Sequence, residues 1–206
     1  YQQSFLVALA LVFLSTLLSV FNFSNNFNYT IPTPFSKQPF EFVVGFRKTF
    51  FIIPFSYFLI YQSVLVDNFN LGISSMLLIT LIVLSFYLKP ENEFFIWNFS
   101  TTSKHFLRSK IKIALLYFTL LSLPIIISLL LFFPKEIIIV LAFLLLSYIY
   151  IITIIFVKYS AYPNEISLTE GILISTSLMF PPLLLIITPL LYNKSIKQLN
   201  NILEND

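Results

Sequence analysis

The sequence predicts an all-α, polytopic integral membrane protein with about six transmembrane helices and a short interfacial helix between the third and the fourth. Two observations carry this prediction. The 206 residues are 58% hydrophobic and only 10% charged, with a mean hydropathy of +0.91, whereas soluble domains carry roughly 25% charged residues. In addition, six stretches are apolar and long enough to cross a bilayer, which needs about 20 residues. The natural solvent of such a chain is lipid.

The predicted spans differ in strength. The fifth is the strongest, because its Ile, Leu, Val and Phe residues each favour insertion by roughly 0.3 to 0.6 kcal/mol and no charge opposes them. Pro54 and Gly72 weaken the second and third. No internal repeat or low-complexity linker divides the chain, so residues 1–206 are expected to form a single transmembrane domain. In chain order, the spans cover residues 4–21, 49–66, 68–88, 113–133, 137–157 and 171–191.

The distribution of Lys and Arg predicts the orientation. With six spans, nine of the twelve fall on the side of the loop between the third and fourth spans, and three fall on the other side. The positive-inside rule then places this loop in the cytoplasm and both termini outside, in what we expect to be a bacterial inner (cytoplasmic) membrane. The chain begins with Tyr1 instead of Met. We therefore expect a fragment that lacks an earlier span, or a first span that does not cross fully.

The loop between the third and fourth spans is the only long segment rich in charge. It covers residues 89–112, KPENEFFIWNFSTTSKHFLRSKIK, and is called the 89–112 stretch below. Pro90 is typical of a first helical position, and Glu91 and Glu93 would then lie in the first turn, where carboxylates favour the positive end of the helix dipole. Aromatic residues around Trp97 follow, as is typical of the headgroup region.

In the second half of the 89–112 stretch, a run of Ser and Thr residues breaks the helical pattern. A new basic helix is then expected to begin and to continue into the fourth span. Lys104, Arg108 and Lys112 recur every four residues, well placed for lipid phosphates. His105 has no acidic neighbour in the sequence, so we interpret it as a solvated or lipid-facing side chain. Two interpretations of the whole stretch stay open: an interfacial helix that anchors the loop, and a coupling helix on which a soluble motor pushes.

This arrangement resembles the membrane subunits of type-2 ABC exporters. In those permeases a cytoplasmic helix follows a span, and a phrase Ser-x-x-x-Phe-Leu-x-x-Lys comes after it; here Ser103, Phe106, Leu107 and Lys110 supply a similar phrase. The resemblance implies a separate ABC ATPase subunit and a second permease copy or half as partners. It also implies an ATPase-coupling segment with these members: Glu91, Glu93, Phe95, Trp97, Lys104, Phe106 and Arg108.

Several kinds of functional group are absent from the sequence, and their absence argues against several classes of function. Ionisable groups deep in a membrane mark function, and none of the six predicted spans carries one away from its ends. The chain has no Cys, a single His and no phosphate-binding Gly motif, so we expect no enzyme, cofactor, metal or nucleic-acid partner. A transporter that has neither a coupling-ion site nor a nucleotide site must take its energy from a separate protein. We therefore expect a permease component of an ATP-driven exporter; the alternative is a non-catalytic membrane scaffold or assembly factor of an envelope complex.

Prolines within the predicted spans are candidate hinges. Pro54, Pro124, Pro181 and Pro182 free backbone carbonyls and bend helices. One interpretation is that they let spans switch between inward-open and outward-open states. The other is that they are ordinary constituents of membrane helices, where proline is common.

Overall fold

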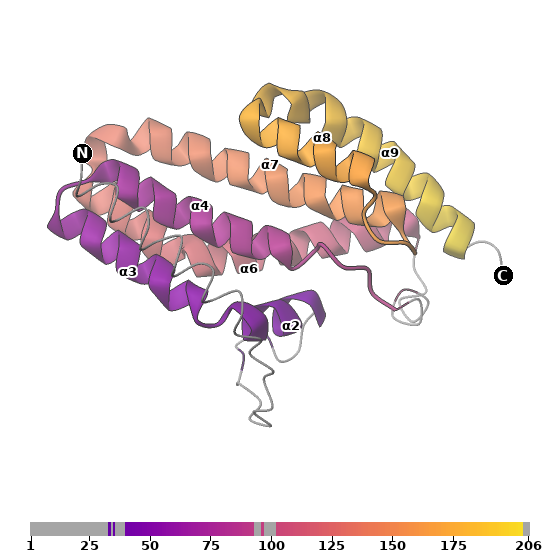
Figure 1. The fold of residues 1–206 in the computed structure, drawn as a ribbon, viewed down its shortest axis with the longest axis horizontal. Helices are drawn as coiled ribbons and strands as arrows, with labels where there is room; N and C mark the ends of the chain where they lie inside the picture. The colour runs from indigo at the N-terminus through magenta and orange to yellow at the C-terminus, as the bar shows by residue number, and fades with distance from the viewer. Residues whose placement is uncertain (1–32, 34, 36–39, 93–95, 97–101, 204–206) are drawn as a thin grey trace, which may run out of the picture. The chain divides into compact units, whose positions relative to one another are not determined.

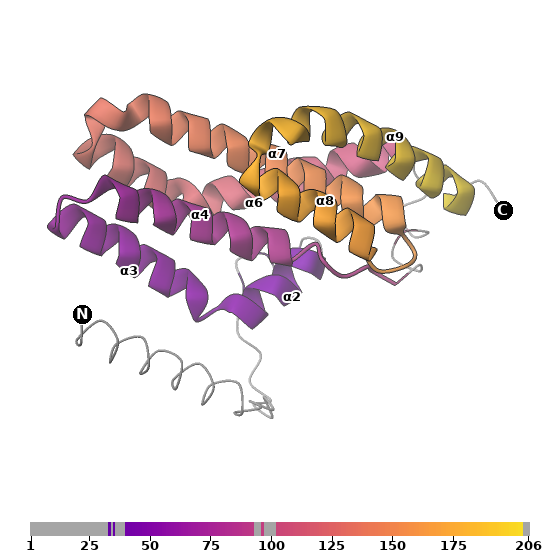
Figure 2. The ribbon, with the colours of Figure 1, turned by 45° about the horizontal axis from the view of Figure 1, so that its top comes forward.

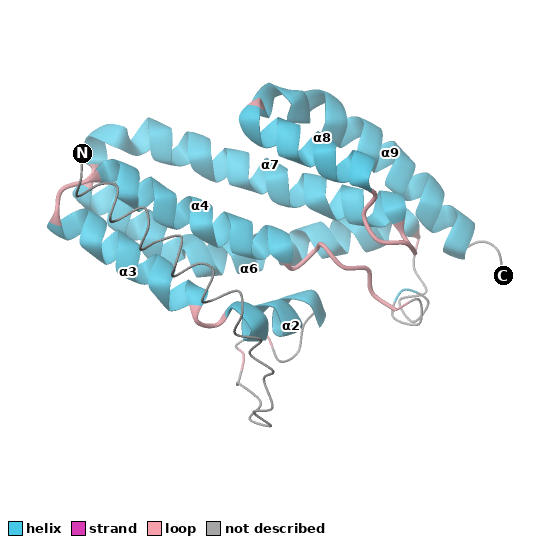
Figure 3. Cartoon of the chain, viewed as in Figure 1, coloured by secondary structure: helices cyan, strands magenta, loops and turns pink. Residues whose placement is uncertain are grey.

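The structure is a computed structural model that describes residues 33, 35, 40–92, 96 and 102–203. Within these residues every regular element is a helix (Figure 3), which confirms the predicted all-α class. The predicted first span, residues 4–21, lies outside them. The elements are α2 (Phe40–Thr49), α3 (Ile52–Leu65), α4 (Phe69–Ser85), α6 (Ser103–Phe132), η1 (Pro134–Glu136), α7 (Ile137–Ala161), α8 (Leu168–Met179), η2 (Pro181–Leu183) and α9 (Leu184–Leu203).

Helices α3, α4, α6 and α7 pack side by side in alternating directions (Figures 1 and 2). Their facing sides are lined by fully buried residues such as Met76, Ile79, Phe118 and Ile151. Hydroxyl groups join neighbouring helices inside this bundle. For example, Thr80 of α4 donates a hydrogen bond of 2.9 Å to Ser147 of α7. Small residues and hydroxyl bonds of this kind are typical of helix contacts in membranes.

The outward faces of the same helices are as apolar as the inward faces. Phe55, Leu131 and Ile138 are 52%, 70% and 79% exposed, respectively. A helix that is hydrophobic all round belongs in a large core or in a membrane, and nothing in this small bundle covers these faces among the described residues. The apolar outer surface therefore indicates that the chain is associated with a membrane.

Among the residues that the structure describes, two helices are long and apolar enough to cross a bilayer, and a bent pair of helices could together form a third crossing. The two are Ser103–Phe132 and Pro134–Ala161, with 30 and 28 residues; the third is the pair Glu41–Thr49 and Ile52–Leu65, bent by 66° at the break between them. Apolar helices α4 and α8 are shorter; at 1.5 Å per residue α4 spans only about 26 Å of a hydrocarbon core of about 30 Å. The predicted six-span topology is thus not supported, although the predicted fourth and fifth spans lie in α6 and α7.

The predicted sixth span is broken in two. Helix α8 ends at Met179, Pro181 and Pro182 form the short turn η2, and α9 begins at Leu184. Proline lacks the backbone N–H that would continue a helix, and its ring disfavours helical geometry in the residue before it. In agreement, Phe180 has a non-helical backbone (φ −133°, ψ 82°). The two prolines therefore do more than bend a span, because they separate two helices.

Helices α8 and α9 form a hairpin against α7. Tyr150 of α7 donates a hydrogen bond of 2.6 Å to the carbonyl oxygen of Ser177, near the end of α8. At the other end of α7, Ser160 donates to Glu170 at the start of α8, and Gln198 of α9 donates to the Tyr162 carbonyl. The chain thus runs back along α7 in α8 and returns in α9 (Figure 1). Both ends of the hairpin lie at the end of α7 that carries Ala161.

This hairpin changes the charge count between the two ends of the bundle. The prediction of six spans places Lys194 and Lys197 opposite the 89–112 stretch, but the hairpin brings both to the same end. Of the eleven Lys and Arg residues that the structure describes (the chain's twelve less Lys37), ten lie at this end and only Lys135 lies at the other. This end is called the basic end below. The positive-inside rule predicts that this end faces the cytoplasm.

The candidate hinge prolines occupy different positions. Pro54 is the third residue of α3, where its missing N–H is not needed by the helix. Pro124 lies inside α6, which continues through it without a break. Pro181 and Pro182 form the tip of the hairpin. Hinge motion at these sites stays a prediction.

Candidate functional site

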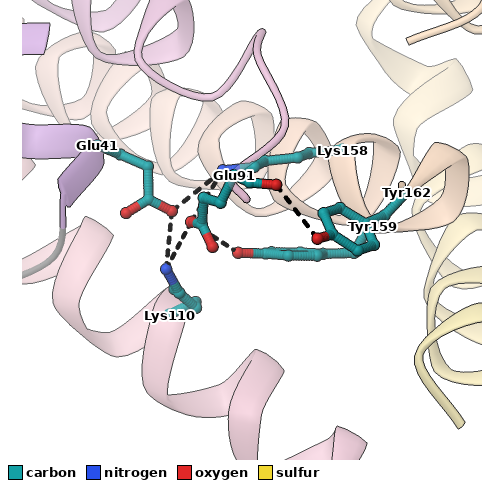
Figure 4. A network of polar contacts seen from close by, with 6 residues as sticks. All are labelled: Glu41, Glu91, Lys110, Lys158, Tyr159 and Tyr162. Carbon is teal, nitrogen blue, oxygen red and sulfur yellow. Dashed lines mark hydrogen bonds and ion pairs between the residues drawn. The ribbon is translucent and has the colours of Figure 1, made fainter. Parts of the chain in front are cut away.

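Four buried charges meet at the basic end of the bundle (Figure 4). Oε1 of Glu41 accepts hydrogen bonds from Lys110 Nζ at 2.9 Å and from Lys158 Nζ at 3.1 Å. Oε1 of Glu91 accepts from the same two ammonium groups, at 2.6 Å and 3.0 Å. Each lysine therefore bridges both carboxylates. These four residues are called the charge network, and none of them is more than 8% exposed.

Each member of the charge network comes from a different part of the chain. Glu41 lies in the first turn of α2, Lys110 in α6, and Lys158 in the last turn of α7. Glu91 lies in the irregular residues 90–92, which follow α4. The sequence predicted that Pro90 begins a helix with Glu91 in its first turn; instead residues 90–92 are irregular. That irregular backbone lets the Glu91 side chain enter the bundle.

Tyrosine side chains surround the charges. Tyr159 donates a hydrogen bond of 3.2 Å to Oε1 of Glu91, and Tyr162 donates one of 3.2 Å to the Glu91 carbonyl oxygen. Lys158 Nζ lies 5.6 Å from the ring centroid of Tyr87 and 5.4 Å from that of Tyr159, within the range of cation–π attraction. Glu91 is thus held through both its side chain and its backbone.

The electrostatic balance of the charge network explains how it can be buried. Two carboxylates and two ammonium groups sum to zero, and buried charges persist in proteins when they are paired and hydrogen-bonded. Burial raises the pKa of Glu91 above its ordinary value, and the adjacent Glu41 carboxylate raises that pKa further, while Lys158 and Lys110 oppose the shift. Loss of any single partner would leave an uncompensated charge in the interior.

The charge network also lies at a defined depth. The apolar part of α7, residues 137–157, is about 31 Å long at 1.5 Å per residue, close to the hydrocarbon thickness of about 30 Å. Lys158 follows directly after it. The network therefore lies inside the bundle at the end of the apolar part of α7, and it joins the start of the 89–112 stretch to α2, α6 and α7.

The predicted coupling residues divide into three groups. Lys104 and Arg108 are exposed on α6. Glu91 and Phe106 are buried, and the Phe106 ring packs edge-to-face against Tyr159 with centroids 5.2 Å apart; as buried side chains these two anchor the stretch and do not form a contact surface. The last group lies outside the described residues: Glu93, Phe95 and Trp97.

Sequence reasoning missed most of the charge network. Glu41 lies between the predicted spans 4–21 and 49–66, where the sequence indicated a connecting loop, and it is instead on α2. Lys110 was singled out only as part of the phrase that resembles the exporter family, and Lys158 was counted only among the cations that predict the orientation. One signal was available: two carboxylates and two lysines border apolar segments on one side of the membrane. Their pairing, however, requires the positions of four separate elements.

The charge network fixes four charged side chains in place through mutual ion pairs, and we assign it no catalytic chemistry. In the part of the chain that the structure describes, no group of three or more His, Cys, Asp or Glu side chains is arranged to hold a metal ion. Comparison with known protein families, with curated proteins and with solved structures gives no match to this chain. Its function must therefore be argued from its own residues.

Proposed function

We propose that this chain is the membrane-spanning permease component of an ABC-type, ATP-driven exporter. In this proposal a separate ATPase subunit contacts the 89–112 stretch from the cytoplasm of a bacterial cell, and the chain works with a second permease copy or half in the inner membrane. The chain carries no phosphate-binding Gly motif of its own. A transport cycle in such a chain requires energy from a partner.

The charge network is the observation that carries the proposal. A loop that touched only lipid would move without moving the helices behind it. Here Glu91 is joined to Lys110 of α6 and Lys158 of α7 through ion pairs of 2.6 Å and 3.0 Å. Breaking a buried ion pair by removing one partner costs about 3 to 5 kcal/mol. A force on the stretch would therefore move the attached helices before it separated these charges.

Buried apolar side chains reinforce the same connection. Ile96, within the stretch, is 1% exposed, and Phe106, on the first turn of α6, is 3% exposed. The stretch is thus anchored to the bundle at Glu91, at Ile96 and at Phe106. This leaves Lys104, which is exposed beside Phe106, as the described residue best placed to touch a cytoplasmic partner.

The first part of the test asks whether an ATPase contacts this end. The chain is co-expressed in bacterial membranes with the ABC ATPase subunit that the proposal requires, sought in an adjacent reading frame, and a photo-crosslinking amino acid replaces Lys104. The matched control places the same group at Lys135, the exposed cation at the opposite end. We expect an ATPase cross-link from position 104 and none from position 135. Equal cross-linking at both positions would overturn the proposal.

The second part asks whether the contact transmits force. Asp67, exposed in the turn between α3 and α4 at the far end of the bundle, is changed to Cys and labelled with a membrane-impermeant maleimide. We expect ATP with vanadate to change the labelling rate, and we expect Glu91→Gln to suppress that change while the cross-link at position 104 persists. A labelling rate that never responds to nucleotide would favour the scaffold alternative over the permease.

A further inference from the structure

An open cavity of about 740 Å³ lies beside the first half of α6. The side of it that the structure describes combines two kinds of surface. Cationic and polar groups occur together with two aliphatic side chains, in a single helical face. The lining residues are His105, Arg108, Ser109, Ile111, Lys112 and Leu115.

The cations of this cavity are available to a ligand. Arg108 and Lys112 are exposed, and neither has an ion pair or side-chain hydrogen bond within the described ranges. They are four residues apart, so they lie one above the other on the helix. Lys110, between them in sequence, points to the opposite side and belongs to the charge network. The cavity and the network are therefore separate sites on opposite faces of α6.

The position of the two cations along α6 matches a lipid headgroup layer. The apolar part of α6, residues 113–132, measures about 30 Å at 1.5 Å per residue, which equals the hydrocarbon thickness. Lys112 is thus at the edge of the hydrocarbon, and Arg108 lies about 6 Å further out. Each headgroup layer is roughly 5 to 8 Å thick. Lys104, about 12 Å beyond the edge, lies past that layer.

We propose that this cavity binds the headgroup of one anionic phospholipid. Arg108 and Lys112 contact the phosphate oxygens, for which a guanidinium offers two parallel donors. Ser109 is placed between them to donate a further hydrogen bond. Leu115, inside the hydrocarbon, and Ile111, close to its edge, contact the upper part of an acyl chain. A free phosphate ion would use the cations but not this apolar wall.

The proposal also separates two functions on the same helix. Arg108, expected from the sequence to contact the ATPase, is assigned to lipid, while Lys104 is kept for the ATPase. The lipid site does not depend on the permease function, because it rests only on the depth and chemistry of α6. A bound lipid here would fix the depth of α6 in the membrane, and with it the height of the charge network on the opposite face.

The test measures lipid binding to the full-length chain by native mass spectrometry in detergent. Phosphatidylglycerol and phosphatidylcholine with identical acyl chains are titrated separately, so that only the headgroup charge differs. We expect one phosphatidylglycerol to bind preferentially. Removing a cation near a membrane surface costs about 1 kcal/mol, or about fivefold in affinity. Arg108→Gln combined with Lys112→Gln should therefore lower the affinity for phosphatidylglycerol about 25-fold.

Matched controls distinguish a specific lipid-binding site from general electrostatic attraction between cations and anionic lipid. Lys104→Gln removes the same charge from the same helix outside the headgroup layer, so we expect it to leave the affinity within about twofold. An equal loss in Lys104→Gln, or equal binding of phosphatidylcholine, would overturn the proposal. Inorganic phosphate in millimolar excess is expected not to displace the lipid; full displacement would identify an anion site and contradict the proposed contact with the acyl chain.

Discussion

Lys158 Nζ donates a hydrogen bond of 3.0 Å to Oε1 of Glu91 inside the helical bundle, although the two residues are 67 positions apart in the chain. Glu91 belongs to the irregular segment after α4, and Lys158 to the last turn of α7. The contact joins the charged loop at the basic end to a long apolar helix through an ion pair. The stability of the loop therefore depends on the charge balance of all four network residues.

Lys158→Met should strongly destabilise the chain. The variant keeps a side chain of similar length but leaves Glu41 and Glu91 to share Lys110 alone. Removing one partner of a buried ion pair costs about 3 to 5 kcal/mol. The measurement is thermal unfolding in detergent, with Lys104→Met as the control, because Lys104 is exposed and should change little.

A second variant separates charge balance from packing. Glu41→Gln added to Lys158→Met restores a neutral network, with one carboxylate facing one ammonium group. We expect the double variant to recover a substantial part of the lost stability. If it is as unstable as the sum of the two single variants, the charge network does not behave as one unit.

Two glycines should respond in opposite directions to alanine. A Cβ on Gly45 of α2 would lie 2.2 Å from Cδ1 of Phe86, a buried ring, whereas a Cβ on Gly171 of α8 meets nothing within 4 Å. Overpacking costs about 1 to 3 kcal/mol, while alanine in a helix gains up to about 1 kcal/mol over glycine. Gly45→Ala should lower the unfolding temperature and Gly171→Ala should raise it slightly. A rise in both would contradict the close packing of α2 on Phe86.

The sequence was sufficient to predict α6 and α7 but not the end of the chain. The long apolar runs of these two helices predict membrane helices. The segment from Gly171 to Leu191 is equally apolar, and Pro181 and Pro182 were read as a bend. Two more features accompany the hairpin: the capping box between Ser167 and Glu170 at the start of α8, and contacts to α7 from both arms. The second of these is tertiary, and no local pattern encodes it.

The candidate site was predictable only in part, for a related reason. The basic and aromatic character of the 89–112 stretch marked it as important. Glu41 gave no comparable signal, because α2 is short and its sequence, FEFVVGFRKT, resembles an aromatic loop. The helix becomes evident only when Phe42 and Gly45 are seen packed on Phe86.

The hairpin should loosen at low pH. Burial alone would raise the pKa of Glu170, but hydrogen bonds from Lys194, from the Ser167 N–H and from Ser160 hold it below its ordinary value. A carboxyl whose folded pKa is lowered stabilises the fold above its unfolded pKa, and that contribution is lost as the pH falls through the folded value. We therefore expect faster hydrogen exchange in the first turn of α8 below about pH 4, near the ordinary Glu pKa.

The control for this pH effect is Glu170→Gln. Glutamine does not titrate and forms no ion pair with Lys194, so exchange in α8 should be faster at neutral pH and should no longer rise on acidification from this group. A pH response of the same size in the variant would show that another group is responsible.

The orientation of the hairpin leads to the most direct test of the topology. Lys197 on α9 and Lys104 on α6 are both exposed at the basic end, and Lys135 is exposed at the other. Each is changed to Cys in separate variants of this cysteine-free chain and treated in intact cells with a membrane-impermeant maleimide. We expect labelling at position 135 only, with positions 104 and 197 labelled after the membrane is opened.

A continuous sixth span would instead expose position 197 together with position 135, because one further crossing moves α9 to the far side. Labelling of position 104 from outside would reverse the orientation and remove the 89–112 stretch from the reach of any cytoplasmic ATPase.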